Sequence, residues 1–453
     1  MQHIIEQQRA YFQSHETKSI SFRRKQLKRL KQAILAHEQN LFKAIASDFQ
    51  KSAFDTYTTE LALVYHDIDI ALSNLKLWAQ TKSVKTNLVN FPAKSYVVPE
   101  PLGVALVIGA WNYPYQLCFG PIVPAIAAGC TVVIKPSEIP SATSAAIATL
   151  IKESFPANYI TVVEGGIPET TALLKQKFDK IFFTGSTYVG KIVYKAAAEN
   201  LTPVTLELGG KSPAIVAKDA NLKMAAKRLV WGKFLNAGQT CIAPDYIWVD
   251  RLVQEEFLNL LVAEIPKEKF DVANGNYVQI INTRNLERLE KMLLPKRTVI
   301  GGVVDHENRT ISPTILKDIT FEDQCMQEEI FGPILPVIGY TDLDEVISKT
   351  IKLPKPLSCY VFSSNQKTKN RIVKEIPFGG GGVNETVMHI SNPHLPFGGT
   401  GGSGIGSCHG EAGFRAFSHY KSILDKTTMF ELPLKYYPHT NKKLWWIKQF
   451  FKW

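Results

Sequence analysis

Short runs of almost entirely apolar residues alternate with helix-length stretches in the first half of the chain. The runs are VALVIGA, TVVIKP, YITVVEG and KIFFTG, all between residues 104 and 185. Strands that helices cover on both faces of a parallel sheet have this unbroken apolar pattern. The pattern therefore predicts an α/β domain with a doubly wound parallel sheet.

The flanking segments have other patterns. Over residues 1–80 apolar positions recur at helical spacing, which predicts a helical start. The later runs TLELGG, PAIVA, DYIWVD, PILPVIGY and SCYVFSS predict a second α/β region over about 210–390. Two stretches outside both regions, LVNFPAKSYVVPEP and FRAFSHYKSIL, look extended, and we expect them to pair at a subunit boundary.

Composition narrows the class of protein. The 453 residues are too many for one core and indicate two or three domains. The net charge of +11 favours anionic partners, but the Lys and Arg residues are spread over many segments without a nucleic-acid motif, so we expect no nucleic-acid partner. The six cysteines form no CxxC pair and no zinc-ligand spacing, and the N-terminal stretch does not have the pattern of a secretory signal. We therefore expect a cytoplasmic protein without a metal site.

The loop GSTYVGK fits parts of two phosphate-binding patterns. Gly185, Gly190 and Lys191 match the GxxxxGK of a P-loop, but Ile192 stands where Mg²⁺ binding requires Ser or Thr. The two glycines also match the outer glycines of GxGxxG, with Thr187 in place of the middle one. From these residues alone, a plain strand-to-helix turn and a phosphate cradle are equally open.

Candidate chemical groups stand beside the predicted strands. Asn112 follows VALVIGA, and Lys135 and Glu138 follow the next apolar run. Glu207 closes an apolar strand before a Gly-Gly turn. Side chains at the carboxyl ends of parallel strands face a common crevice. Cys241, in NAGQTCIAPDY, is the candidate nucleophile, although an isolated cysteine is more often a small buried hydrophobic residue.

Taken together, these stretches resemble a known family. AWNYP, KPSE, FTGS, ELGGKSP and GQTC occur in the order, and at about the intervals, found in the NAD(P)-dependent aldehyde dehydrogenase superfamily. QEEIFGP (327–333) and LPFGGTGGSGIG (395–406) complete the set, so the resemblance covers nearly the whole chain. GQTCIAPDY and GGIPET look most like the class 3 branch, which acts on fatty and aromatic aldehydes.

The resemblance implies oxidation of an aldehyde to a carboxylic acid. Cys241 would attack the aldehyde to form a thiohemiacetal, and Asn112 with the Cys241 backbone N–H would stabilise the oxyanion. Hydride loss to NAD(P) leaves a thioester, which water activated by Glu207 would hydrolyse, with Glu329 as a second candidate base. One alternative is an acylating enzyme in which coenzyme A takes the acyl group. The presence of Glu207 argues against this alternative. The other is an inactive binding protein, which the intact catalytic residues make improbable.

The resemblance also resolves the glycine loop. GSTYVG resembles a degenerate Rossmann turn in which Gly185, Ser186 and Gly190 belong to the cofactor site, and Lys191 is then a surface residue. Lys135 and Glu138 should bind the adenine-side ribose of the cofactor.

On the other side of the cofactor, Glu329 should bind the nicotinamide-side ribose, with Phe331 packing nearby. The charge of Glu138 would repel a 2′-phosphate, which favours NAD, although relatives of this branch use both cofactors and NADP stays open.

The expected division of the chain follows from the same resemblance. The NAD(P)-binding domain is expected at 1–82 and 100–208, the catalytic domain at 209–390, dimer-forming strands at 83–99 and 411–425, and a C-terminal tail at 426–453. A homodimer is the expected assembly.

The tail sequence NKKLWWIKQFFKW places large apolar residues among Lys442, Lys443, Lys448 and Lys452. It is too short to span a bilayer, which takes about 20 residues. A helix of this composition suits an anionic membrane interface. The alternative is that the aromatic rings pack on the enzyme's own surface or across a dimer contact.

Overall fold

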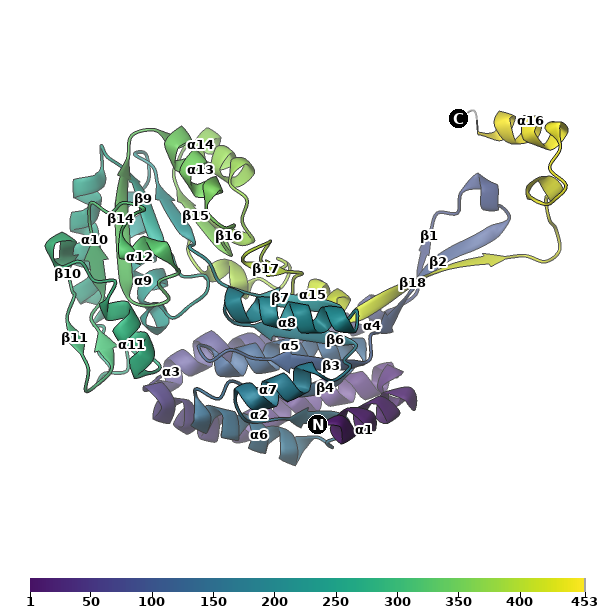
Figure 1. Ribbon diagram of the computed structural model, residues 1–453, viewed down its shortest axis with the longest axis horizontal. Coiled ribbons are helices and arrows are strands. Elements are labelled where there is room, and N and C mark those ends of the chain that lie inside the picture. Colours follow the sequence, from purple (N-terminus) through teal and green to yellow (C-terminus); the bar gives the residue numbers. More distant parts are fainter. Residues whose placement is uncertain (452–453) are drawn as a thin grey trace. The chain divides into compact units, whose positions relative to one another are not determined.

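The computed structural model describes residues 1–451, which form two compact units. The first unit contains Met1–Trp78 and Pro101–Ser418, and the second contains Ala79–Glu100 and the described part of His419–Trp453. Both extended α/β sheets lie in the first unit (Figure 1).

The first sheet has six strands in the order β17-β7-β6-β3-β4-β5. Its strands are β3 (Val104–Ile108), β4 (Thr131–Lys135), β5 (Ile160–Val162), β6 (Lys180–Thr184), β7 (Val204–Glu207) and β17 (Gly404–Ile405). All neighbouring pairs are parallel except β17 with β7. The apolar pattern alone placed the strand of TLELGG in the second α/β region, and this was wrong, because β7 pairs with β6. The division expected from the resemblance, with the NAD(P)-binding domain reaching residue 208, includes β7 with the strands it pairs with. An apolar run shows that a strand is buried but does not show which sheet it joins.

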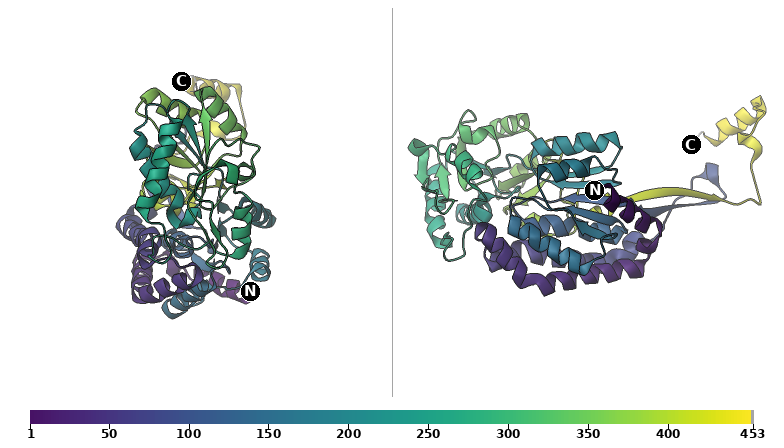
Figure 2. Two further views of the ribbon diagram at one scale, coloured as in Figure 1. Left: turned by 90° about the vertical axis from the view of Figure 1, so that its left-hand side faces the viewer. Right: turned by 60° about the horizontal axis from the view of Figure 1, so that its bottom comes forward.

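Helices cover both faces of this sheet, as the views in Figure 2 also show. On one face, Ile5, Leu173 and Val193 share a core with inward-facing strand residues such as Leu106 and Phe183. The helices that supply this cover are α1 (Gln2–Gln13), α7 (Ile167–Leu174) and α8 (Thr187–Glu199). The connections on the other face are α5 (Pro114–Ala128) and α6 (Ser141–Ser154), against which α2 (Ile20–Phe49) packs.

The second sheet has seven strands in the order β10-β13-β14-β9-β8-β15-β16. They are β8 (Pro213–Val216), β9 (Tyr246–Asp250), β10 (Thr298–Ile300), β13 (Thr314–Leu316), β14 (Ile334–Tyr340), β15 (Ser358–Phe362) and β16 (Gly380–Val383). Its core includes residues of α9 (Leu222–Phe234) and α10 (Gln254–Glu268). The predicted α/β class with a doubly wound parallel sheet is confirmed.

Shorter elements complete the first unit. The helices are α3 (Ala53–Thr56), α4 (Ala62–Ala79), α11 (Thr283–Glu290), α12 (Gln324–Gln327), α13 (Leu343–Lys352), α14 (Gln366–Glu375) and α15 (Gly410–Ala416). The strands β11 (Val304–Asp305) and β12 (Thr310–Ile311) form a small hairpin.

The second unit holds a three-stranded sheet in the order β1-β2-β18 and the helix α16 (Asn441–Phe450). The strands are β1 (Lys82–Val84), β2 (Ala93–Pro101) and β18 (Ser418–Lys426). The expectation of an extended segment from 411 was wrong for its first part, since Gly410–Ala416 is helical. Phe414 and Phe417 are both buried at helical spacing, and the Phe414 ring packs on Trp78, so this turn belongs to the first unit.

Candidate active site

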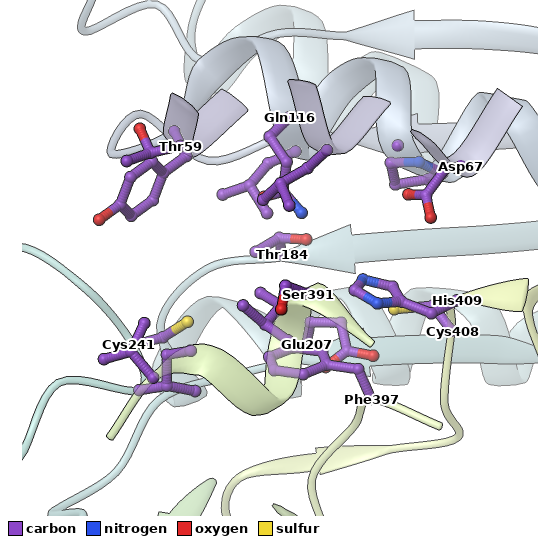
Figure 3. A pocket seen from close by; sticks show the side chains of 18 of the residues that line it. Thr59, Asp67, Gln116, Thr184, Glu207, Cys241, Ser391, Phe397, Cys408 and His409 are labelled. Carbon is purple, nitrogen blue, oxygen red and sulfur yellow. The ribbon is translucent and has the colours of Figure 1, made fainter. Parts of the chain in front are cut away.

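A largely apolar cavity of ≈ 380 Å³ lies in the first unit, lined by α4, α5 and the ends of β6 and β7. Large apolar side chains make up much of its wall: Phe54, Leu63, Trp78, Leu117, Val123, Phe182, Leu208, Trp231, Leu235, Ile242, Val387, Met388, Ile390 and Phe397. Cys241 and Glu207 both line it, and Figure 3 shows them on the same side of the space. The structure therefore brings the predicted nucleophile and base to one apolar cavity.

Cys241 is placed by an irregular turn between α9 and β9. In this turn Asn236 and Ala237 have left-handed backbone angles, with φ of 54° and 51°. Gly238 has φ 73°, and a Cβ there would lie 2.2 Å from the Gly332 carbonyl oxygen, so only glycine fits. This is the physical reason for the NAG sequence before the cysteine.

The environment of Cys241 holds its thiol neutral. Burial is the largest cause and raises the pKa of the thiol to about 12, and the charges of Glu329 and Glu207 add to the rise. The backbone N–H groups of Cys241 and Ile242 act in the opposite direction. A base must therefore take the proton before the sulfur can attack a carbonyl carbon.

Glu207 ends β7, opposite Thr184 of β6 and Gly404 of β17. The residue is buried, and neither carboxylate oxygen accepts a hydrogen bond from an N–H or O–H group. Burial raises its pKa well above the usual value, while the Cys408 thiol and the Lys180 charge lower it. A carboxyl group in this state is poised to exchange a proton with water.

Asn112 is buried in the loop between β3 and α5. Asn112 Nδ2 donates to the Gln239 carbonyl oxygen at 3.0 Å, and Asn236 Nδ2 donates to the Asn112 carbonyl oxygen at 3.1 Å. These bonds tie the loop to the segment directly before Cys241. Since the amide carries two donor hydrogens, one is left for another acceptor.

A buried ion pair supports the same loop and had no signal in the sequence. Lys51 Nζ lies 2.7 Å from Glu60 Oε1, and both side chains are almost completely buried. Glu60 Oε2 accepts hydrogen bonds from the backbone N–H of Tyr115 at 2.8 Å and of Gln116 at 3.3 Å, at the start of α5. The Lys51 ammonium lies over the Tyr113 ring, 4.2 Å from its centre. Removing one partner of such a pair typically costs 3–5 kcal/mol, so the loop is firmly held.

The predicted cofactor residues Lys135, Glu138, Gly185 and Ser186 lie at or just beyond the carboxyl ends of strands β4 and β6 in the first sheet. In that sheet β3 lies between β4 and β6, which is where the strand order reverses. Dinucleotides bind at such a switch point, outside the carboxyl ends of the strands. Lys135 ends β4 with its side chain buried, and its Nζ donates to the Pro136 oxygen at 2.6 Å and lies 3.9 Å from Glu138 Oε2. The Lys135 ammonium group has further N–H donors besides the one that binds the Pro136 oxygen, and these can bind a ligand.

The glycine loop connects β6 to α8. Ser186 is the N-cap of α8 and its hydroxyl accepts from Val189 N at 3.3 Å. A Cβ on Gly190 would lie 2.7 Å from Leu208 Cδ2, so this glycine permits close packing of helix and sheet. The third glycine of a dinucleotide fingerprint has this role. Lys191 is exposed on α8, as expected.

Glu329 and Phe331 lie in the loop between α12 and β14. A Cβ on Gly209 would lie 2.0 Å from Glu329 Oε2, so this carboxylate rests against the backbone that follows β7. Burial raises the pKa of Glu329 to about 8, with a further rise from Asp245. The Phe331 ring packs edge-on against Trp111 at 5.3 Å. A partly exposed carboxyl group beside a glycine can accept hydrogen bonds from the hydroxyl groups of a ribose, so the residues present fit a dinucleotide.

Other cavity residues had no clear signal in the sequence. Cys408 and His409 follow the glycine-rich run 395–406, and Asp67 projects from α4. Apolar residues at intervals of three or four show which face of α4 the rest of the protein covers. They do not show that this face lines a cavity. Fold topology alone brings α4 and the 408–409 turn together.

Proteins of similar sequence and structure show the family of this chain. The aldehyde dehydrogenase family model matches residues 1–423. The 4,4'-diaponeurosporen-aldehyde dehydrogenase of Staphylococcus aureus is 46% identical over 459 residues, with 99% of each chain covered. A dimeric, NADP-preferring aldehyde dehydrogenase of Mus musculus is 44% identical over 423 residues, with 93% of each chain covered.

A solved structure, the substrate-bound state of Staphylococcus aureus AldH, matches with a TM-score of 0.97 at 45% identity and covers 99% of each chain. The family and fold predicted from the motifs are confirmed by these matches. The chain belongs to the aldehyde dehydrogenase family and is an NAD(P)-dependent oxidoreductase that oxidises aldehydes.

Proposed function

We propose that this enzyme oxidises apolar aldehydes with a long, isoprenoid or aromatic chain to carboxylic acids. The observation that carries the proposal is the apolar cavity that holds both Cys241 and Glu207. Burying a CH₂ group contributes about 0.8 kcal/mol, so each further carbon of the chain strengthens binding there. The similarity to an enzyme named for a diaponeurosporen aldehyde supports an isoprenoid chain.

Within this proposal Cys241 is the nucleophile. Glu207 and Glu329 are the carboxyl groups whose charges act on its thiol, so either can receive the proton that must leave. Attack on the aldehyde carbon places negative charge on the carbonyl oxygen. The free donor of Asn112 and the backbone N–H of Cys241 stabilise that charge, and loss of one such donor typically costs about 2.7–4 kcal/mol.

When bound, the dinucleotide supplies the hydride acceptor, and Lys135, Glu138, Gly185, Ser186, Gly190, Glu329 and Phe331 are the residues proposed to hold it. Glu207 then takes a proton from the water that hydrolyses the thioester on Cys241. Its raised pKa means that the ionised fraction, and hence hydrolysis, increases as the pH rises. Hydrolysis is favoured over transfer to coenzyme A because this carboxyl group lines the same cavity as the thiol.

The test is NADH formation with straight-chain, isoprenoid and aromatic aldehydes, with and without coenzyme A. We expect kcat/KM to rise with apolar chain length and to be independent of coenzyme A. Dependence on coenzyme A would establish the acylating reaction instead. Absence of turnover with every aldehyde would support a binding protein of the same fold.

The cofactor preference is tested by Glu138→Gln. The Glu138 side chain is about half exposed, at 49%, beside the buried Lys135 ammonium. Removing its charge should raise kcat/KM for NADP relative to NAD by about tenfold, or about 1.4 kcal/mol, since a like-charge contact at about 4 Å costs about 1 kcal/mol in water and more at a half-exposed site. An unchanged ratio of the two kcat/KM values would contradict the placement of Glu138 beside the 2′ position.

We extend the proposal to a homodimer formed through the β1-β2-β18 sheet. β18 is nine residues long and largely exposed, and Val84, Phe91, Ile423 and Leu424 on or beside this sheet are exposed apolar residues. An exposed strand edge with apolar side chains is a surface that a second chain can extend. The similarity to a dimeric enzyme supports the same assembly.

The C-terminal helix supports a peripheral membrane contact. Leu444, Trp445, Trp446 and Phe451 are exposed, and exposed Lys442 and Lys448 flank them. Lys452 and Trp453 of the predicted tail lie outside the described residues, as does the side chain of Phe450. In the part of the chain that the structure describes, no helix is long and apolar enough to cross a bilayer. Rings and ammonium groups in this arrangement suit an interface rich in anionic lipid.

Truncation after Thr440 tests the membrane contact. We expect the full-length protein to co-sediment with anionic vesicles at low salt and to be released at high salt, because the attraction of its lysines is screened. The truncated protein should stay in the supernatant at both salt concentrations. If the full-length protein also stays in the supernatant at low salt, its tail packs on protein and not on lipid.

A further inference from the structure

Asp67 places a carboxyl group in the largely apolar wall of the cavity, at a distance from Cys241. Leu63, Asp67 and Ala71 are spaced four residues apart on α4, so they share one face of the helix, and all three line the cavity. Figure 3 shows Asp67 and Cys241 at opposite ends of the drawn part of the cavity. A carboxyl group therefore stands where its helical neighbours are apolar.

Asp67 has no protein partner that would explain its position. Among residues 1–451 the structure gives it no hydrogen bond and no ion pair. Burial alone raises the pKa of Asp67 to about 7. The residue is only partly exposed, and a polar group that is partly withdrawn from water without a partner destabilises the fold more than leucine at this site would. A bound ligand that donates a hydrogen bond would remove that cost.

The surroundings of Asp67 define the chemistry of such a ligand. Asp55, Asp67 and Glu207 are the acidic residues of the lining, and it contains no Lys or Arg. A carboxylate on the substrate would therefore be repelled. Burial lowers the pKa of His409 to about 4, so this ring is neutral and does not neutralise Asp67. A neutral hydrogen-bond donor on an otherwise apolar chain fits these features.

We propose that Asp67 is a specificity subsite that accepts a hydrogen bond from a hydroxyl group on the distal part of the substrate chain. The proposal rests on the function proposed above, an apolar aldehyde whose chain lies in this cavity. The enzyme then selects hydroxylated long-chain aldehydes over unsubstituted ones of the same length. Asp67 makes no contact with the reacting carbon, so its effect is on substrate choice.

The position of Asp67 limits this selection to long chains. Thr59 lines the part of the cavity near Cys241 in Figure 3, and Asp67 follows it by eight residues. Thr59 lies in the π-helical turn Tyr57–Leu61 that leads into α4, so the two are on the order of 10 Å apart along the helix axis. A short hydroxyaldehyde bound at Cys241 cannot reach the carboxyl group.

The experiment compares ω-hydroxyalkanals with n-alkanals of equal length, in a series of increasing length, on the wild type and on Asp67→Leu and Asp67→Asn. The measured quantity is the ratio of the two kcat/KM values. In the wild type this ratio should pass through a maximum at the length that reaches Asp67. At that length it should fall about tenfold in Asp67→Leu, the size expected for one hydrogen bond to a carboxyl group, and less in Asp67→Asn.

Both substrates are assayed on the same preparation, so partial unfolding of a variant cancels in the ratio. Asp69→Asn is the matched control, because Asp69 lies on the same helix but is exposed and paired with Lys31, and its ratios should equal those of the wild type. A wild-type ratio that does not vary with length, or the same maximum in Asp67→Leu, overturns the subsite. Failure of the proposed function would be seen separately, as n-alkanals whose kcat/KM does not rise with length in the wild type.

Discussion

Replacing Cys241 with alanine is expected to abolish aldehyde oxidation while NAD(P) still binds. The sulfur forms the covalent bond to the substrate, and the backbone N–H groups of Cys241 and Ile242 lie beside it. Removing a catalytic nucleophile typically lowers kcat by about 10⁶. The predicted cofactor residues belong to other loops, so cofactor affinity, measured by fluorescence titration, should stay within about twofold of the wild type, which is less than 0.5 kcal/mol.

Cys359→Ala provides a matched control. Burial raises the pKa of the Cys359 thiol to about 12, as for Cys241, but Cys359 lies in β15 and does not line the cavity. Its variant should therefore retain turnover. Steady-state activity in Cys241→Ala would contradict the assignment of the nucleophile.

Glu207→Gln is expected to separate the two halves of the reaction. The first turnover should still release NADH as a burst, because the thiol remains in place. Hydrolysis should then slow by about 10²- to 10⁴-fold, since the amide cannot take a proton from water. Stopped-flow absorbance measures both phases. In the wild type, hydrolysis should accelerate as the pH rises, because burial raises the pKa of Glu207 and only its ionised form can take a proton from water.

Glu329→Gln distinguishes between the two candidate bases. Its pKa is also raised, to about 8, but its carboxylate rests against the Gly209 backbone, where we propose that it holds the cofactor. Glu329→Gln should have a higher KM for the cofactor and should show no burst of NADH. If Glu329→Gln gives the burst and Glu207→Gln turns over normally, the roles of the two residues are exchanged.

The sequence predicted the fold class because the strands buried on both faces are nearly continuous apolar runs. The apolar pattern did not show which sheet each strand joins, so it placed β7 in the second region, whereas the resemblance placed residues up to 208 in the first. The helical turn at 410–416 was also missed. Its signal is the three-residue spacing of Phe414 and Phe417, which are both buried, Phe414 against Trp78 and Phe417 against Phe182.

The candidate catalytic residues could be predicted from the sequence more readily than the other residues of the cavity. Cys241 and Asn112 stand in loops and Glu207 ends a strand before a Gly-Gly turn, so motifs could predict them. Asp67 comes from α4, Glu60 from the π-helical turn before it, and Lys51 from the loop after α2, none of which carries a motif. Their positions depend on tertiary packing, including that of the π-helical turn against α5, which no local pattern encodes. The identity of the substrate depends on such residues, and motifs alone therefore leave it open.

The central claim is that an apolar aldehyde becomes a thioester on Cys241, inside the cavity. The most direct measurement is peptide mass spectrometry of Glu207→Gln after brief mixing with NAD(P) and a long-chain aldehyde. We predict the mass of the acyl group on the peptide that contains Cys241, in an amount equal to the burst of NADH. Acylation of Cys408, the other thiol that lines the cavity, or a burst without any acylated cysteine, would contradict the account.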